Sequence, residues 1–91
     1  MIKYTKTTLK KFELLCEEAG YKIRYEKGQF QPGYCLLETK KVIVINKFLS
    51  TEGRISTIAD LLELLDIEAE ILSKRSRELY LETMNQKVNL F

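Results

Sequence analysis

The sequence predicts one α+β domain over residues 1–91, with elements in the order α-β-β-β-α-α and a three-stranded antiparallel sheet packed with helices. Two observations support this fold class. First, hydrophobic residues recur at helical spacing before Gly20 and after Ser50, whereas strand-like runs of apolar residues lie between them. Second, a chain of 91 residues that is 45% hydrophobic and 31% charged can bury its own core, and its single proline leaves little room for linkers.

The first helix is predicted over residues 8–19. One face of this segment collects its apolar side chains, which are Leu9, Phe12, Leu15, Cys16 and Ala19. Thr7 or Thr8 is expected to cap the N-terminus of the helix, because a hydroxyl can accept a hydrogen bond from an unpaired amide there. Gly20 is expected to end the helix in the left-handed conformation.

The three strands are predicted at residues 21–26, 34–38 and 41–45. The first strand alternates apolar and charged residues, as a half-buried strand does. The segment 27–33 contains two glycines and the only proline, so it is predicted to be a connecting loop. Thr39 and Lys40 form a short turn, which makes the second and third strands an antiparallel hairpin.

The third strand is apolar and β-branched from Val42 to Ile45, so both of its faces require burial. If helices cover one face only, the other face needs a further helix or a second subunit. In a simple meander this strand would also be an edge, with unpaired backbone groups that invite a partner. We therefore expect self-association as a homodimer or a higher oligomer, or an unknown protein partner. The candidate interaction surface comprises Val42, Val44, Phe30, Tyr25 and Arg24.

The second half of the chain predicts the main core helix, which begins after Ser50 as N-cap. Its wide apolar arc consists of Ile55, Ile58, Ala59, Leu61, Leu62 and Leu65. A bend is predicted between Asp66 and Ser73, followed by a helix to about Asn85 and a tail, residues 86–91, that packs back or frays.

One long helix from residue 54 is the alternative to this bend. No glycine or proline interrupts the segment 54–91, and four apolar residues are spaced by sevens, namely Ile58, Leu65, Leu72 and Leu79. The intervening seam positions Ala69, Ser76 and Thr83 are weak for a coiled coil, which favours the bend.

The formal charge of +2 comes from 15 basic and 13 acidic residues, a balance too weak to indicate an electrostatic nucleic-acid binder. The charge is nevertheless uneven. Residues 1–47 carry ten Lys or Arg against five Asp or Glu, whereas residues 48–91 carry five against eight. Opposed charges suit docking between protein surfaces, copies of this chain included. With no signal peptide or membrane span in the sequence, the expected location is the cytoplasm.

The complete absence of histidine removes the Ser-His-Asp and Cys-His arrangements and the HExxH zinc motif. Cys16 and Cys35 are expected to be free thiols, each acting as a small buried apolar residue. Asp60 and Glu63 share a helix face, but a solvated surface is their simplest interpretation. The expectation is therefore a protein with no catalytic site, metal site or cofactor.

Two other functions stay open. A nucleic-acid-binding module could use the basic aromatic hairpin 21–34, where four aromatic residues are interleaved with Lys and Arg: Tyr21, Tyr25, Phe30 and Tyr34. An enzyme with an unrecognised carboxylate or thiol site would require Cys35 or Asp60 to lie in a concave pocket with a perturbed pKa.

A resemblance to a known family comes from residues 33–46, GYCLLETKKVIVIN, followed by residues 56–65, STIADLLELL. Together they resemble the core of ImmA/IrrE-type zinc peptidases, in which a strand leads into a helix that carries HExxH. Thr57, Ile58 and Ala59 match the approach to that motif. Asp60, Leu61 and Leu64 stand where His, Glu and His would be required, so the resemblance implies a degenerate core without peptidase activity.

Overall fold

A computed structural model of the chain describes residues 2–28 and 33–88. Its elements follow the predicted order, with three strands between the first and second helices: α1 (Lys6–Glu18), β1 (Lys22–Glu26), β2 (Tyr34–Leu37), β3 (Val42–Asn46), α2 (Thr51–Leu61) and α3 (Lys74–Val88). Three single 3-10 turns lie between them, at Glu38–Lys40, Leu62–Leu64 and Ala69–Ile71. The α+β class is therefore confirmed.

The strand order is β1-β3-β2, with β1 parallel to β3 and β2 antiparallel to it. The hairpin of β2 and β3 is confirmed, whereas the expectations of a wholly antiparallel sheet and of a third strand at its edge are wrong. Both errors have one physical cause. The central position gives β3, the most apolar strand, two paired neighbours, and it leaves the alternating strand β1 at an edge.

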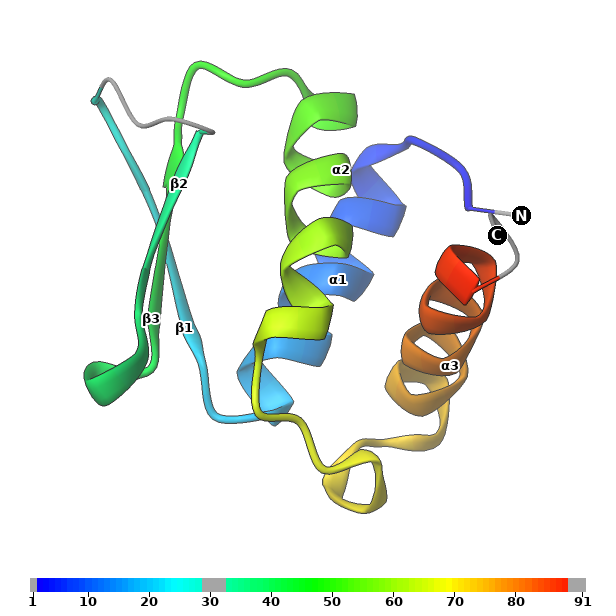
Figure 1. Cartoon of the computed structure of the whole chain (residues 1–91). Coiled ribbons are helices and arrows are strands. Elements are labelled where there is room, and N and C mark those ends of the chain that lie inside the picture. The colour runs from blue at the N-terminus through cyan, green and yellow to red at the C-terminus, as the bar shows by residue number, and fades with distance from the viewer. Residues whose placement is uncertain (1, 29–32, 89–91) are drawn as a thin grey trace.

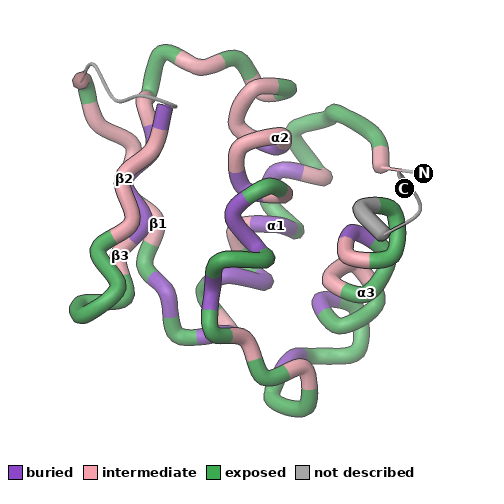
Figure 2. Tube along the Cα trace, viewed as in Figure 1, coloured by how far each residue is buried: buried purple, intermediate pink, exposed green. Residues whose placement is uncertain are grey.

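All three helices lie on the same side of the sheet, with α1 and α2 next to it and α3 beyond them (Figure 1). Buried residues gather between the sheet and these helices (Figure 2). Ile43 and Ile45 of β3 point into this core and are 0% exposed. They meet α2 and α1 residues such as Ile58 and Phe12, which are also fully buried.

Helix α1 begins earlier than predicted, because Thr5 is its N-cap in place of Thr7 or Thr8. Thr5 has an extended backbone, and its side-chain oxygen accepts a hydrogen bond from the amide of Thr8 at 3.2 Å. At the other end Gly20 has φ +94°, a conformation that glycine adopts without strain, so the predicted helix stop is confirmed.

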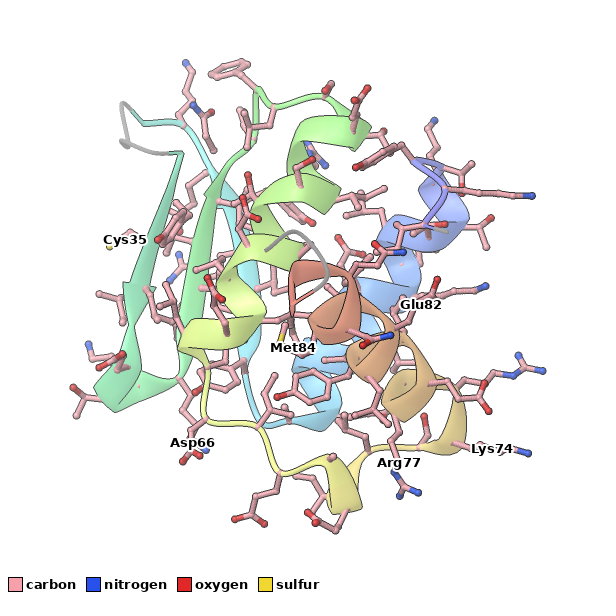
Figure 3. The ribbon with its side chains drawn as sticks, turned by 45° about the vertical axis from the view of Figure 1, so that its right-hand side comes forward. Cys35, Asp66, Lys74, Arg77, Glu82 and Met84 are labelled. Carbon is pink, nitrogen blue, oxygen red and sulfur yellow. The ribbon has the colours of Figure 1, made fainter. Side chains whose placement is uncertain are left out.

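Helix α2 ends at Leu61, and the chain bends before α3 begins at Lys74. The single long helix is therefore wrong. Leu65 and Leu72 adopt extended backbone conformations on either side of the bend, and both are buried in the core. Arg77 holds the bend by donating hydrogen bonds to the carbonyl oxygens of Ala69 and Leu72, at 3.0 and 3.2 Å (Figure 3).

Helix α3 packs against α1, and its small side chains Ser76 and Thr83 are buried, while Leu79, Tyr80 and Met84 pack against the core. Ser76 and Thr83 are the seam positions that appear weak in the sequence, and their small volume lets the helix backbones approach. The Thr83 hydroxyl donates to the carbonyl oxygen of Leu79 at 2.8 Å, so its burial leaves no unpaired donor. No helix among residues 2–28 and 33–88 is long and apolar enough to cross a membrane.

Two acceptors cap the N-terminus of α3: the Ser73 hydroxyl, which accepts a hydrogen bond from the Ser76 amide at 3.4 Å, and Glu18 at the end of α1. The Glu18 carboxylate accepts hydrogen bonds from the backbone amide of Ser73 at 2.7 Å and from its hydroxyl at 3.0 Å. The hydrogen bond from the Ser73 amide is the largest cause that lowers the pKa of Glu18 below 4.5. The carboxylate thus joins the end of α1 to the start of α3 in its charged form.

Replacing Glu18 by alanine is expected to lower the free energy of unfolding by about 1 kcal/mol at neutral pH, because the amide and hydroxyl of Ser73 lose their acceptor while the Ser73–Ser76 hydrogen bond remains. A lowered folded-state pKa means that this stabilisation is present above pH 4.5 and is lost as the pH falls through the folded pKa. Urea denaturation of both proteins across this range measures the difference. Glu17→Ala, one residue earlier, is the control, and an equal loss there would contradict the capping role.

Candidate functional site

The face of the sheet that points away from the helices is the candidate interaction surface, and we call it the open face. The register of the strands places three rows of side chains on it. Lys22 of β1, Val42 of β3 and Leu37 of β2 form the first row, and Arg24, Val44 and Cys35 form the second. Glu26 of β1 and Asn46 of β3 form the third row. None of the described helices covers this face (Figure 1).

The open face is apolar along β3 and β2 and charged along β1. Leu37 is 42% exposed, whereas Val44 is only 9% exposed because Arg24 and Cys35 flank it in register. Figure 3 shows Cys35 on the side of β2 away from the helices. Arg24 and Glu26 form an ion pair at 2.7 Å along the β1 edge. Such an exposed pair contributes little to stability, so either charge can exchange its partner at little cost when another surface approaches.

The structure brings together three of the five predicted interaction residues, Val42, Val44 and Arg24. Tyr25 points to the opposite side of β1, toward the helices, and Phe30 lies outside the described residues. Sequence reasoning missed Leu37 and Cys35. The predicted hairpin could have located them, because its short turn sets which residues stand beside Val42 and Val44.

Tyr25 belongs to a cluster that ties β1 to α1 and α2. Its hydroxyl donates a hydrogen bond to the Glu13 carboxylate, and the Arg54 guanidinium lies over its ring, 4.3 Å from the centroid. Arg54 also donates to the carbonyl oxygens of Lys47 and Leu49, at 2.7 and 3.2 Å. Burial, followed by the bond to Glu13 and its negative charge, raises the pKa of Tyr25 well above its usual range. The cluster thus holds a neutral tyrosine and braces the fold.

An open cleft of about 580 Å³ lies beside this cluster, between α1 and the free edge of β1. Glu13 and Glu17 of α1 form one wall, and residues 20–23 with Tyr25 form the other. A second, smaller cleft of about 430 Å³ lies between α1 and α3 and is lined in part by Leu14 and Leu79. Neither cleft is lined by Cys35 or Asp60, the residues on which an unrecognised enzyme site would depend.

The segment 21–34 does not form a hairpin, because β3 lies between β1 and β2. Its aromatic and basic residues are also separated. Tyr25 and Tyr34 pack toward the core, whereas Lys22 and Arg24 stand on the open face. The structure therefore does not assemble, from the described residues, the stacking surface that single-stranded nucleic acid requires.

The two thiols have different surroundings. Cys16 is buried in the core as expected, and burial followed by the nearby charge of Glu13 raises the pKa of its thiol to about 12. Cys35 is a free, partly exposed thiol on the open face, so its expected burial is only partial. Within the described part of the chain, no group of three or more Cys, Asp or Glu side chains is placed to hold a metal ion.

The residues that align with the zinc-peptidase motif occupy three different environments. Asp60 is exposed on α2, whereas Leu61 is fully buried at the end of that helix. Leu64 is exposed in the 3-10 turn that follows, so the α-helical face of an HExxH motif does not extend to it.

Comparison with known proteins gives no assignment: no family model matches the sequence, and no curated protein or solved structure matches it significantly.

Replacing Tyr25 by phenylalanine is expected to lower the free energy of unfolding by about 1 kcal/mol, because the ring remains under Arg54 while the hydrogen bond to Glu13 is lost. Urea denaturation at neutral pH measures the change. Tyr4→Phe is the matched control, since Tyr4 is exposed on the surface. Equal stability of Tyr25→Phe and the wild-type protein would show that the hydrogen bond does not brace β1.

Proposed function

We propose that this chain is a non-enzymatic protein-interaction domain that associates with a second copy of itself through the open face. The observation that carries the proposal is the central strand β3, whose side chains are apolar on both faces while helices cover one face only. Leu37, Val42 and Cys35, with the largely buried Val44 between them, form an apolar stripe that a partner can cover.

The charges on β1 favour a second copy as this partner. Along the open face this strand carries Lys22 at its start and Glu26 at its end. A two-fold axis that runs across the strands would pack two open faces with their strands reversed. Lys22 of each copy then lies opposite Glu26 of the other, and Val44 lies near its own counterpart at the axis. The two Arg24 side chains also meet near the axis, where the ion pair of each with its own Glu26 offsets their charge.

The size of the open face limits the strength of this contact. Three strands of four or five residues cover roughly 14 by 16 Å, given the usual strand spacing and rise. A stable interface buries about 800 Å² on each partner, which is well above what this face offers. We therefore infer a weak dimer whose fraction rises with protein concentration. An apolar stripe that is flanked by charged residues agrees with such a weak contact.

Sedimentation equilibrium from micromolar to millimolar protein should show a reversible increase in weight-average mass toward that of a dimer. Leu37→Lys should keep the chain monomeric over the same range, because it places a charge in the apolar stripe. Leu14→Lys is the matched control, since Leu14 is 50% exposed on α1, away from the open face. This control should associate like the wild-type protein.

Cys35 supplies an independent readout, because it lies on the open face while Cys16 is buried. Its reaction with a thiol reagent should slow as the protein concentration rises, and the Leu37→Lys variant should lose this dependence. A monomer at millimolar concentration would contradict self-association. A dimer that Leu37→Lys leaves intact would contradict the open face as its interface.

A further inference from the structure

The free edge of β1 presents hydrogen-bonding groups that the sheet does not use. The amide of Lys22 donates to the Lys41 carbonyl oxygen, and the carbonyl oxygen of Glu26 accepts from the Lys47 amide, so these two residues pair with β3. Backbone groups of successive strand residues point alternately to the two sides of a strand. The N–H and C=O groups of Ile23 and Tyr25 therefore point away from β3.

Nothing in the described part of the chain pairs with these groups. Strand β1 is at the end of the sheet order, and none of the hydrogen bonds found outside the regular elements involves the backbone of Ile23 or Tyr25. The other edge strand, β2, also has a free side, but α1 stands beside β1 alone and leaves the 580 Å³ cleft between them.

We propose that the β1 edge and this cleft together bind an extended basic segment of a partner protein as an additional strand. The backbone of the segment would pair with Ile23 and Tyr25 and extend the sheet, a recurring mode of peptide recognition. Alternate side chains of an added strand point to opposite faces of the sheet. Half of them would enter the cleft beside α1.

The charge of the cleft selects basic side chains at these positions, because its lining residues include two glutamates and one lysine, Lys22. Glu13 and Glu17 lie on its helical wall, and they are four residues apart on one face of α1. Glu13 already accepts the Tyr25 hydroxyl, so Glu17 is the carboxylate that a Lys or Arg of the segment would approach. A long basic side chain could also lay its methylene groups against the apolar wall near Ile23.

The same carboxylates argue against a second copy at this edge. Two β1 strands paired antiparallel about a two-fold axis would bring their α1 helices side by side. Glu13 and Glu17 of each copy would then lie close to those of the other, and four carboxylates would repel one another at one place. The edge contact is therefore distinct from the proposed association through the open face, and it does not depend on it.

Amide hydrogen exchange of the full chain, with and without a probe peptide, tests this proposal. The probe is a capped peptide of alternating lysine and threonine, and the comparison probe replaces every lysine by glutamate. With the lysine peptide, the amides of Ile23 and Tyr25 should exchange more slowly by tenfold or more. The amides of Lys22, Arg24 and Glu26 should be little affected because β3 already protects that side. The glutamate peptide should have no effect.

Glu17→Lys should weaken binding of the lysine peptide at least fivefold, as measured by fluorescence anisotropy of a labelled peptide. Glu68→Lys, the same charge change at an exposed position outside the cleft, should leave binding within twofold. Lack of slower exchange at Ile23 and Tyr25 would overturn the added strand. Equal binding of the glutamate peptide, or of the lysine peptide to the Glu17→Lys variant, would overturn the basic selectivity. Neither result would bear on self-association through the open face, which is tested by the Leu37→Lys variant and by the thiol reactivity of Cys35.

Discussion

The central position of β3 is the constraint on which the rest of this structure depends. Four successive apolar β-branched residues require water to be removed from both faces of one strand. The fold satisfies this requirement fully on one side, where Ile43 and Ile45 are completely buried beneath α1 and α2. On the other side it places Val42 and Val44 between two neighbouring strands, which bury Val44 and leave Val42 partly exposed.

Charged side chains brace the connections around this core. Arg54 holds the segment after β3 through the Lys47 and Leu49 carbonyl oxygens, and Arg77 does the same for the bend before α3. Glu18 caps α3 from the end of α1. These contacts satisfy backbone groups that turns and helix ends leave unpaired, which explains why a chain with few glycines can bend sharply between its helices.

The two binding surfaces proposed for this chain use different chemistry on adjoining parts of one strand. Side chains of β1, β3 and β2 form the open face, where burial of apolar area would drive association. At the edge of β1, backbone groups and the carboxylates of α1 would select an extended basic segment. Because Leu37 belongs only to the first surface and Glu17 only to the second, separate substitutions can distinguish them.

Local patterns in the sequence determined the α+β class, the hairpin of β2 and β3, the Ser50 cap, the Gly20 stop and the bend before α3. Each of these depends on residues close together in the chain, whose periodicity or capping chemistry is visible directly. The same patterns predicted Val42, Val44 and Arg24 as interaction residues, and the three share the open face of the sheet, where Val44 is buried. Only the tertiary structure decided that β1 pairs in parallel with β3, that Tyr25 turns inward to Glu13 and Arg54, and that a cleft opens beside the β1 edge. Backbone pairing is chemically the same for every strand, so the order of the strands depends on which of them gains most from burial. How much each strand gains is decided only when the helices pack against the sheet.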